Sequence, residues 1–259
     1  MLRFAVIGHP VAHSLSPRIH AANFRALGIE AAYDAVDVAS ADLAAALRRF
    51  AADGLRGINV TVPHKVAVMD LVDRVDSAAA EAGAVNTVLF APDGSTAGFN
   101  TDMAGFLHPL KSCGFPFAGA KVLVLGAGGA SRAVVAACRA AGCASLTQAN
   151  RTARPGMLQL GSEECLAAAR AADLVVNATT VGLREGDPCV IDAGAFRAGQ
   201  LVYDLIPVAR ETATLAAARA AGARTLDGLG MLAAQAAESF RIWTGRMADL
   251  SAMLSALDR

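Results

Sequence analysis

A glycine-rich segment, VLVLGAGGAS, contains residues that could bind a charged cofactor. Gly126, Gly128 and Gly129 follow an apolar run and precede a helical pattern. Glycine lets the backbone approach a pyrophosphate closely, and the amides and dipole at a helix start bind its negative charge. Ser131 stands at the third position of this fingerprint, where glycine or alanine is usual. A merely tight turn between a strand and a helix therefore stays an alternative.

The next predicted strand ends in ANRTARP. An NAD site would carry Asp or Glu here for the ribose hydroxyls, but this chain has Asn150, Arg151, Thr152 and Arg154. An arginine fork can stack on adenine and pair with a phosphate. These residues favour NADP over NAD, and the alternative is an ordinary solvated loop.

In the first half of the chain, the segment HSLSPRIH has two interpretations. Ser16 as a helix N-cap, with Pro17 at the first helical position, would explain two residues without any ligand. Ser14 is left over in that interpretation, so ligand binding by the two serines stays open.

Other polar residues of interest are Lys65 in NVTVPHK, Asp102 in NTD, and Gln235 near the end of the chain. Taken singly, such a lysine is typical of a solvated loop, the aspartate of a helix cap, and the glutamine of a half-exposed helix face. His64, beside Lys65, is expected to be a packing or surface residue.

These residues are embedded in alternating strand and helix patterns. Up to about residue 100, the apolar runs FAVIG, AAYDAVDV, GINVTV and AVNTVLF alternate with helical stretches, which indicates a mixed, mainly parallel αβ domain. PDGST predicts a hairpin turn. A helix is expected from Asp102 to about Ser112, and CGFPFAG resembles a connector.

The second half repeats the alternation in KVLVLG, SLTQANR, LVVNAT and LVYDLI, with a helix expected between neighbouring strands. This pattern is typical of a Rossmann-type, doubly wound sheet. LGMLAAQAAESFRIWTG predicts a final helix. The predicted fold class is therefore α/β with two domains.

Composition excludes several kinds of partner. Among 259 residues, Lys plus Arg and Asp plus Glu are balanced at 23 each, which argues against nucleic acid or an anionic membrane surface. Charged residues interrupt every apolar run before the 18 or so residues that a spanning helix needs. The five cysteines show no CxxC spacing, so neither a disulfide framework nor a metal site is expected. MLRFAVIGHP resembles a first strand rather than a signal peptide, and a cytoplasmic location is expected.

Taken together, the motifs resemble the shikimate dehydrogenase family over nearly the whole chain. The matching segments are GHPVAHSLSPRIH, GINVTVPHK, GAVNTV, GFNTD, LGAGGASRA, NRT, NATTVGL, YDLI and DGLGMLAAQAAESFRIWTG. The resemblance implies reduction of 3-dehydroshikimate to shikimate with NADPH, a step toward chorismate and the aromatic amino acids. It also implies a substrate domain at 1–103 plus 229–259, an NADP domain at 104–228, and a monomer or homodimer.

The resemblance also implies roles for individual residues. Lys65 and Asp102 would be the catalytic pair. A lysine–carboxylate pair suits the reaction because oxidising a secondary alcohol needs a proton acceptor at its oxygen. The substrate's hydroxyls and carboxylate would be held by Ser14, Ser16, Asn59, Thr61, Asn86 and Gln235. The cofactor would lie on Gly126, Ala127, Gly128, Gly129, Ala130, Asn150, Arg151, Thr152 and Arg154, with Leu205 and Gly228 near the nicotinamide.

The chain departs from the family pattern at three places. Pro207 stands where the family usually has a tyrosine that contacts the substrate, the segment after NRT is shorter than usual, and Arg154 lies closer to NRT than the family's second basic residue does. The alternatives are a quinate/shikimate dehydrogenase of broader specificity and, from a different class, a non-catalytic dinucleotide sensor.

Overall fold

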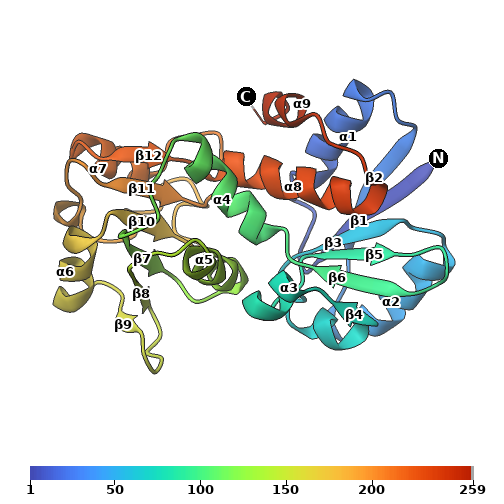
Figure 1. The fold of residues 1–259 in the computed structure, drawn as a ribbon, viewed down its shortest axis with the longest axis horizontal. Coiled ribbons are helices and arrows are strands. Elements are labelled where there is room, and N and C mark those ends of the chain that lie inside the picture. The colour runs from blue at the N-terminus through green and yellow to red at the C-terminus, as the bar shows by residue number, and fades with distance from the viewer. Residues whose placement is uncertain (258–259) are drawn as a thin grey trace. The chain divides into compact units, whose positions relative to one another are not determined.

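The structure, a computed structural model, describes residues 1–257. The chain forms two compact units, which are Met1–Gly105 with Ala233–Arg259, and Phe106–Leu232. They are called the first and second unit below (Figure 1). Each unit contains one six-stranded sheet with helices packed on it, so the predicted two-domain α/β fold is confirmed. Within the described residues, no helix is both long and apolar enough to cross a membrane.

The sheet of the first unit is mixed. The strand order across the sheet is β2 (Ala31–Asp37), β1 (Leu2–Gly8), β3 (Gly57–Val60), β5 (Thr87–Phe90), β6 (Thr96–Phe99) and β4 (Arg74–Val75). β5 runs antiparallel to both of its neighbours, β3 and β6, whereas the other strand pairs run parallel. The antiparallel pairing of β5 with β6 confirms the turn predicted at PDGST.

Side chains of β1 alternate between the two faces of this sheet, as expected for a strand buried on both sides. Phe4 and Val6 pack against α1 (Ser16–Ala26) and α8 (Gly228–Thr244), and Ala5 and Ile7 pack against α2 (Leu43–Ala52). The helical elements that belong wholly or partly to this unit are α1 (Ser16–Ala26), η1 (Ser40–Asp42), α2 (Leu43–Ala52), η2 (Ala67–Leu71), α3 (Ser77–Ala82), α4 (Asp102–Ser112), α8 (Gly228–Thr244) and α9 (Leu250–Ser255).

All strand pairs in the sheet of the second unit are parallel. Numbered along the chain, its strands lie in the order 3-2-1-4-5-6, the doubly wound arrangement that the alternating pattern predicted. The strands, in that order, are β9 (Leu158–Gln159), β8 (Ser145–Asn150), β7 (Lys121–Leu125), β10 (Leu174–Asn177), β11 (Leu201–Asp204) and β12 (Arg224–Leu226).

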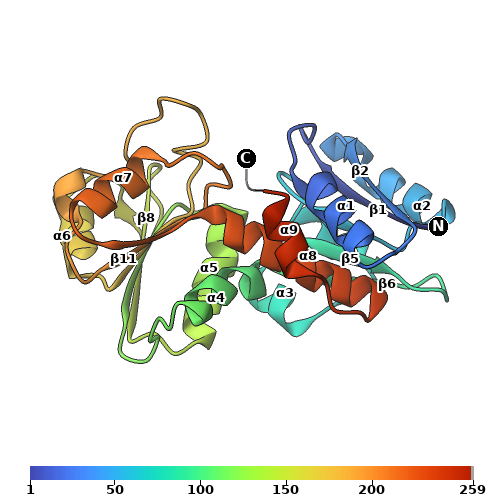
Figure 2. The same ribbon diagram turned by 90° about the horizontal axis from the view of Figure 1, so that it is seen from above.

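Helices cover both faces of this sheet (Figure 2). α5 (Gly129–Ala140) lies on one side, and α6 (Glu163–Ala171) and α7 (Ala213–Ala220) lie on the other. The prediction of a helix between β10 and β11 is wrong, because the described connection contains only the short 3-10 turn η3 (Ala193–Ala195). Gly182 and Gly186 have positive φ in that connection, and Pro188 follows them, so no continuous helical pattern can form.

Candidate active site

Lys65 and Asp102, 37 residues apart, form an ion pair in the first unit. Lys65 Nζ lies 2.6 Å from Asp102 Oδ2, and the two side chains are only 14% and 8% exposed. β3 ends before Pro63, and the backbone N–H of Val85 donates to the carbonyl of Lys65, which fastens the lysine to the segment before β5. Lys65 is therefore directed to a carboxylate and is not the solvated side chain that its local sequence suggests.

The second oxygen of Asp102 is also bonded. Asn86 Nδ2 donates to Asp102 Oδ1 over 2.7 Å, and Asn86 Oδ1 accepts the backbone N–H of Thr101 over 2.8 Å. Antiparallel pairing of β5 with β6 brings the residues beside these strands together. The cap-type bond at the start of α4 comes instead from Asn100, whose Oδ1 accepts the N–H of Met103. Asp102 thus uses both carboxylate oxygens for side-chain partners.

Three buried hydroxyl groups lie within hydrogen-bonding distance of one another, and two of them, those of Thr87 and Thr101, also bond to Asn86. They belong to Thr87 on β5, Thr101 before α4 and Ser239 on α8. These hydroxyls and the side chains hydrogen-bonded to them are called the buried network, or the network, below. Ser239 Oγ lies 2.8 Å from Thr87 Oγ1 and 3.1 Å from Thr101 Oγ1. Thr101 Oγ1 also donates to Gln235 Oε1 over 3.4 Å, which joins the predicted substrate residue Gln235 to the same network.

Asn59 is enclosed by this network. Its Nδ2 donates to Ser239 Oγ at 2.9 Å and to Thr87 Oγ1 at 3.1 Å, while its Oδ1 accepts the hydroxyl of Tyr33 at 2.6 Å. Asn59 is 5% exposed, so its amide is occupied by protein groups. Thr61, two residues along the chain, is half-buried, and its methyl group lies against the backbone of Gly8.

Tyr33 connects Asn59 to the predicted serine pair. Burial raises the pKa of Tyr33 well above its ordinary value, and a hydrogen bond with Ser16 partly offsets that effect. The phenol therefore stays protonated and can donate to Asn59. α1 begins at Ser16, and the N-cap position is taken by Leu15, whose side chain makes no capping hydrogen bond. The N-cap interpretation of Ser16 is therefore wrong in the described structure. Ser14 Oγ accepts the backbone N–H of Ser16 over 3.3 Å.

Two histidines near the network are structural. His20 stacks on Tyr33 with ring centres 4.3 Å apart, and burial lowers its pKa to about 3, an effect that Asn59 partly opposes. It is therefore neutral near pH 7. His64 is buried, and its Nε2 lies 2.7 Å from the carbonyl oxygen of Val38, as expected for a packing residue. The acid–base groups available in this network are Lys65 and Asp102.

Sequence reasoning did not identify Tyr33, Thr87, Thr101 or Ser239 as site residues. Ser239 alone carried a usable signal, because it lies four residues after Gln235 and so on the same side of a helix. Tyr33 and Thr87 lie inside ordinary strand patterns, where a hydroxyl residue carries no local sign of its partners.

In the second unit, the glycine-rich segment forms the turn from β7 into α5. Gly126 has φ +111°, and a Cβ there would lie 2.7 Å from the carbonyl oxygen of Ala178, so only glycine fits. A Cβ on Gly128 would meet nothing within 4 Å, so the backbone there is open. Open backbone at the start of a twelve-residue helix fits a pyrophosphate.

Ser131, at the third fingerprint position, has a structural role in this turn. Its buried hydroxyl donates to the carbonyl of Gly126 over 2.7 Å and accepts from Gln148 Nε2 over 3.0 Å. The serine thereby ties the glycine turn to β8 in a way that glycine or alanine could not.

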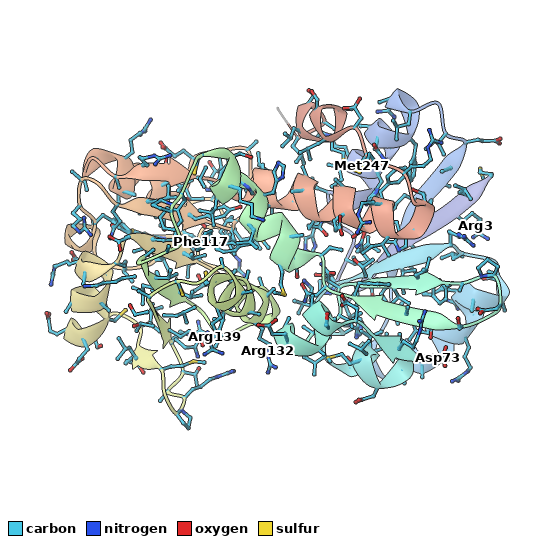
Figure 3. All side chains as sticks on the ribbon, in the orientation of Figure 1. Arg3, Asp73, Phe117, Arg132, Arg139 and Met247 are labelled. Atoms are coloured by element: carbon cyan, nitrogen blue, oxygen red, sulfur yellow. The ribbon has the colours of Figure 1, made fainter. Side chains whose placement is uncertain are left out.

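Cationic side chains lie on the first turn of α5 and on the loop after β8, and one of them contacts the glycine turn. Arg154 Nη1 lies 3.5 Å from the carbonyl oxygen of Ala127, and Arg151 is exposed nearby along the chain. Asn150 Nδ2 donates to the carbonyl of Thr152, which shapes this loop. Arg132 adds an exposed guanidinium on the first turn of α5 (Figure 3). The open glycine turn and these donors fit a dinucleotide with an additional phosphate.

Leu205 and Gly228 lie together at the end of β11. A Cβ on Gly228 would lie 2.5 Å from the carbonyl carbon of Leu205, so α8 starts directly against that backbone. Asp204 accepts from Asn177 Nδ2 and from Thr212 Oγ1, which joins β10 to the start of α7. Burial raises the pKa of Asp204, although these hydrogen bonds oppose the shift.

Comparisons with known proteins point to one family. The family model described as "Shikimate dehydrogenase substrate binding domain" matches residues 6–88. The model described as "Shikimate 5'-dehydrogenase C-terminal domain" matches residues 228–257. The first match lies in the N-terminal part of the first unit. The second match begins at the start of α8 and covers the C-terminal part of the same unit.

Individual relatives are similar over almost their whole length. The shikimate dehydrogenase (NADP(+)) of Moorella thermoacetica is 45% identical, over 96% of this chain and 90% of that one. The crystal structure of a shikimate 5-dehydrogenase from Thermus thermophilus, in complex with NADP(H) and shikimate, is 42% identical with a TM-score of 0.91, covering 99% of this chain and 98% of that one. The Aquifex aeolicus shikimate dehydrogenase structure is 37% identical with a TM-score of 0.91, covering 100% and 98%.

Proposed function

Because the chain belongs to the shikimate dehydrogenase family, we propose that it reversibly reduces 3-dehydroshikimate to shikimate with NADPH, a step toward chorismate and the aromatic amino acids. The two family models and the curated relatives confirm the family resemblance that the motifs predicted. The observation that carries the proposal is the Lys65–Asp102 pair, with Nζ and Oδ2 2.6 Å apart and Asn86 on the other carboxylate oxygen.

Lys65 is the proton-transfer group in this proposal. In carbonyl reduction its ammonium gives a proton to the developing alkoxide oxygen, and in alcohol oxidation the neutral amine accepts one. Asp102 holds Nζ in place through Oδ2 and is itself held by Asn86. NADPH, when bound, supplies the hydride for the carbon atom.

The substrate's hydroxyl groups and carboxylate are assigned to polar residues of the first unit. Hydroxyl and amide groups suit a polyol because a site that bonds each hydroxyl penalises an analogue lacking one. The assigned residues are Ser14, Ser16, Asn59, Thr61, Asn86 and Gln235. Support for this set is that hydrogen bonds join Asn59, Asn86 and Gln235 to the network around the Lys65–Asp102 pair.

NADP is assigned to the second unit. The pyrophosphate is placed on Gly126, Ala127, Gly128, Gly129 and Ala130; the adenosine 2′-phosphate on Asn150, Arg151, Thr152 and Arg154; and the nicotinamide near Leu205 and Gly228. We assign substrate binding to 1–103 plus 229–259 and cofactor binding to 104–228. We also propose that the protein is cytoplasmic and is a monomer or a homodimer. Light scattering after size-exclusion chromatography tests its oligomeric state.

The function is tested by assaying shikimate and quinate, each with NADP and with NAD. The expected result is the highest kcat/KM for shikimate with NADP. Equal or better turnover of quinate would instead support a quinate/shikimate dehydrogenase of broader specificity, which Pro207 permits because proline lacks the usual tyrosine hydroxyl. Nucleotide binding without turnover of either acid would support a non-catalytic sensor.

A further inference from the structure

Ser239 occupies the centre of the buried network. The residue lies on α8, its side chain is fully buried, and its Oγ has hydrogen-bonding contacts with three other chain segments. The contacts are Asn59 Nδ2 at 2.9 Å, Thr87 Oγ1 at 2.8 Å, Thr101 Oγ1 at 3.1 Å and, on its own helix, the carbonyl of Gln235 at 3.0 Å.

The direction of the hydrogen bonds follows from the groups at the two ends of the network. A carboxylate can only accept and a backbone N–H can only donate, so Asp102 and the amide of Thr101 fix the orientation of the Asn86 side chain. Asn59 Nδ2 also faces a carbonyl oxygen, that of Asn86, at 3.3 Å, which fixes the orientation of Asn59. Asn59 Oδ1 must then accept the Tyr33 hydroxyl.

These orientations create a chain of donors directed at the carboxylate. Tyr33 donates to Asn59, Asn59 to Thr87, Thr87 to Asn86, and Asn86 to Asp102. Aligned hydrogen bonds polarise one another, particularly in a buried environment. The alignment holds only while Asn59 and Asn86 keep their orientations.

Ser239 connects this series of hydrogen bonds to α8. It accepts from Asn59, and its single hydroxyl hydrogen is left for one of three acceptors, namely the Gln235 carbonyl and the hydroxyls of Thr87 and Thr101. One side chain thus connects the helix that carries Gln235 to β3, β5 and the start of α4.

We propose that Ser239 is a positioning residue for the reaction. It acts through Thr87 and Thr101, whose hydroxyls bond to Asn86 Oδ1, to hold the Asn86 side chain, and therefore Asp102 and Lys65, in position. It also fixes Gln235 relative to that pair. The inference rests on the proposed function and deepens it. Asn59 keeps Thr87 Oγ1 and the Asn86 carbonyl as acceptors when the serine hydroxyl is removed, so the loss is one of orientation and not of folding.

The test compares Ser239→Ala, Ser239→Cys and the control Thr244→Val. Cysteine is slightly larger than serine, so it leaves no cavity, but its thiol is a weak hydrogen-bonding group. Thr244 lies on the same helix, and its hydroxyl donates to the carbonyl four residues earlier, that of Phe240, without joining the network. Each variant is assayed with shikimate and NADP beside the wild type.

The expected result is a loss of roughly tenfold in kcat/KM for shikimate in both Ser239 variants, because small misplacements of a catalytic group reduce turnover strongly. The KM for NADP should stay within about twofold of the wild type, and Thr244→Val should retain wild-type values for both ligands. This split between the two ligands is not expected of general destabilisation.

Wild-type kinetics in Ser239→Ala would overturn the proposal for Ser239. Wild-type kinetics in Ser239→Cys alone would also overturn it, because the loss in Ser239→Ala would then come from the cavity that alanine leaves. An equal rise in the KM for shikimate and the KM for NADP would overturn it as well. Absence of turnover in the wild-type enzyme would overturn the proposed function and this inference together. The wild-type arm therefore separates the two failures.

Discussion

Asn86 donates to Asp102 through Nδ2 over 2.7 Å while its Oδ1 accepts the N–H of Thr101 over 2.8 Å. The side chain consequently has one orientation, with its donor toward the carboxylate. Any residue at position 86 that cannot donate leaves Asp102 with one fewer partner. The orientation of the carboxylate therefore depends on the amide of Asn86.

Asn86→Asp should lower kcat/KM by about two decades at pH 8, because two carboxylates would face each other where an amide now donates. Like charge raises the pKa of the new acid, and below that pKa its protonated form can again donate. Relative to the wild type at the same pH, turnover should therefore recover as the pH falls toward 5. A pH profile parallel to that of the wild type would contradict this explanation.

Lys65→Ala should reduce turnover of shikimate by roughly two to four decades, the usual range for a general acid–base group. NADP affinity, measured by calorimetry, should change little because Lys65 belongs to the first unit and the glycine turn to the second. Lys111→Ala, which removes an exposed lysine at the end of α4, is the control and should retain activity. Near-normal turnover in Lys65→Ala would remove the lysine from its proposed role.

Arg151→Ala should raise the KM for NADP by roughly tenfold or more, since a hydrogen bond between charged groups contributes about 1.5–3 kcal/mol. The KM for NAD should stay unchanged because NAD lacks the 2′-phosphate. The ratio of the two constants is the measurement. An equal change for both nucleotides would place Arg151 elsewhere than at that phosphate.

The free energy of unfolding should decrease as the pH decreases below 6.5, because of His20. Burial lowers the pKa of its imidazole from 6.5 to about 3 in the folded chain, so below pH 6.5 the unfolded state takes up a proton that the folded state does not. The stabilising effect of the neutral ring is complete above pH 6.5 and is lost at about 1.4 kcal/mol per pH unit as the pH decreases toward 3.

Urea unfolding at pH 7 and at pH 5 measures this effect. His20→Phe keeps an aromatic ring beside Tyr33 but cannot be protonated, so its unfolding midpoint should differ less between the two pH values. His13→Gln removes an exposed histidine and should keep the wild-type dependence. Equal pH dependence in all three proteins would show that His20 does not control it.

Much of the fold could be predicted because its signals are local. The apolar runs that became β1, β7 and β10 are continuous, and the glycines before α5 mark a strand-to-helix turn in any context. The missing helix between β10 and β11 shows the limit of this reasoning. An alternating βα rhythm predicts a connection but not its contents, and here glycine and proline determine them.

The candidate site was less accessible to sequence reasoning. Lys65 and Asp102 have ordinary local interpretations, and only the family resemblance paired them before the structure did. Ser16 has the residue type of an N-cap and precedes a proline, yet the helix already includes it. Tyr33, Thr87 and Ser239 meet Asn59 from separate segments of the chain, and no local pattern encodes such a meeting.

The contact between Asn59 and Ser239 spans 180 residues of sequence. On the ribosome, the N-terminal segment of the first unit is synthesised long before its partner serine leaves the exit tunnel, and the entire second unit is made in between. Contacts so distant in sequence form late and slow the search for the native state. The surroundings of the Asp102 carboxylate therefore mature only when the chain is nearly complete, and a polypeptide that stops before Ser239 lacks the group that completes them.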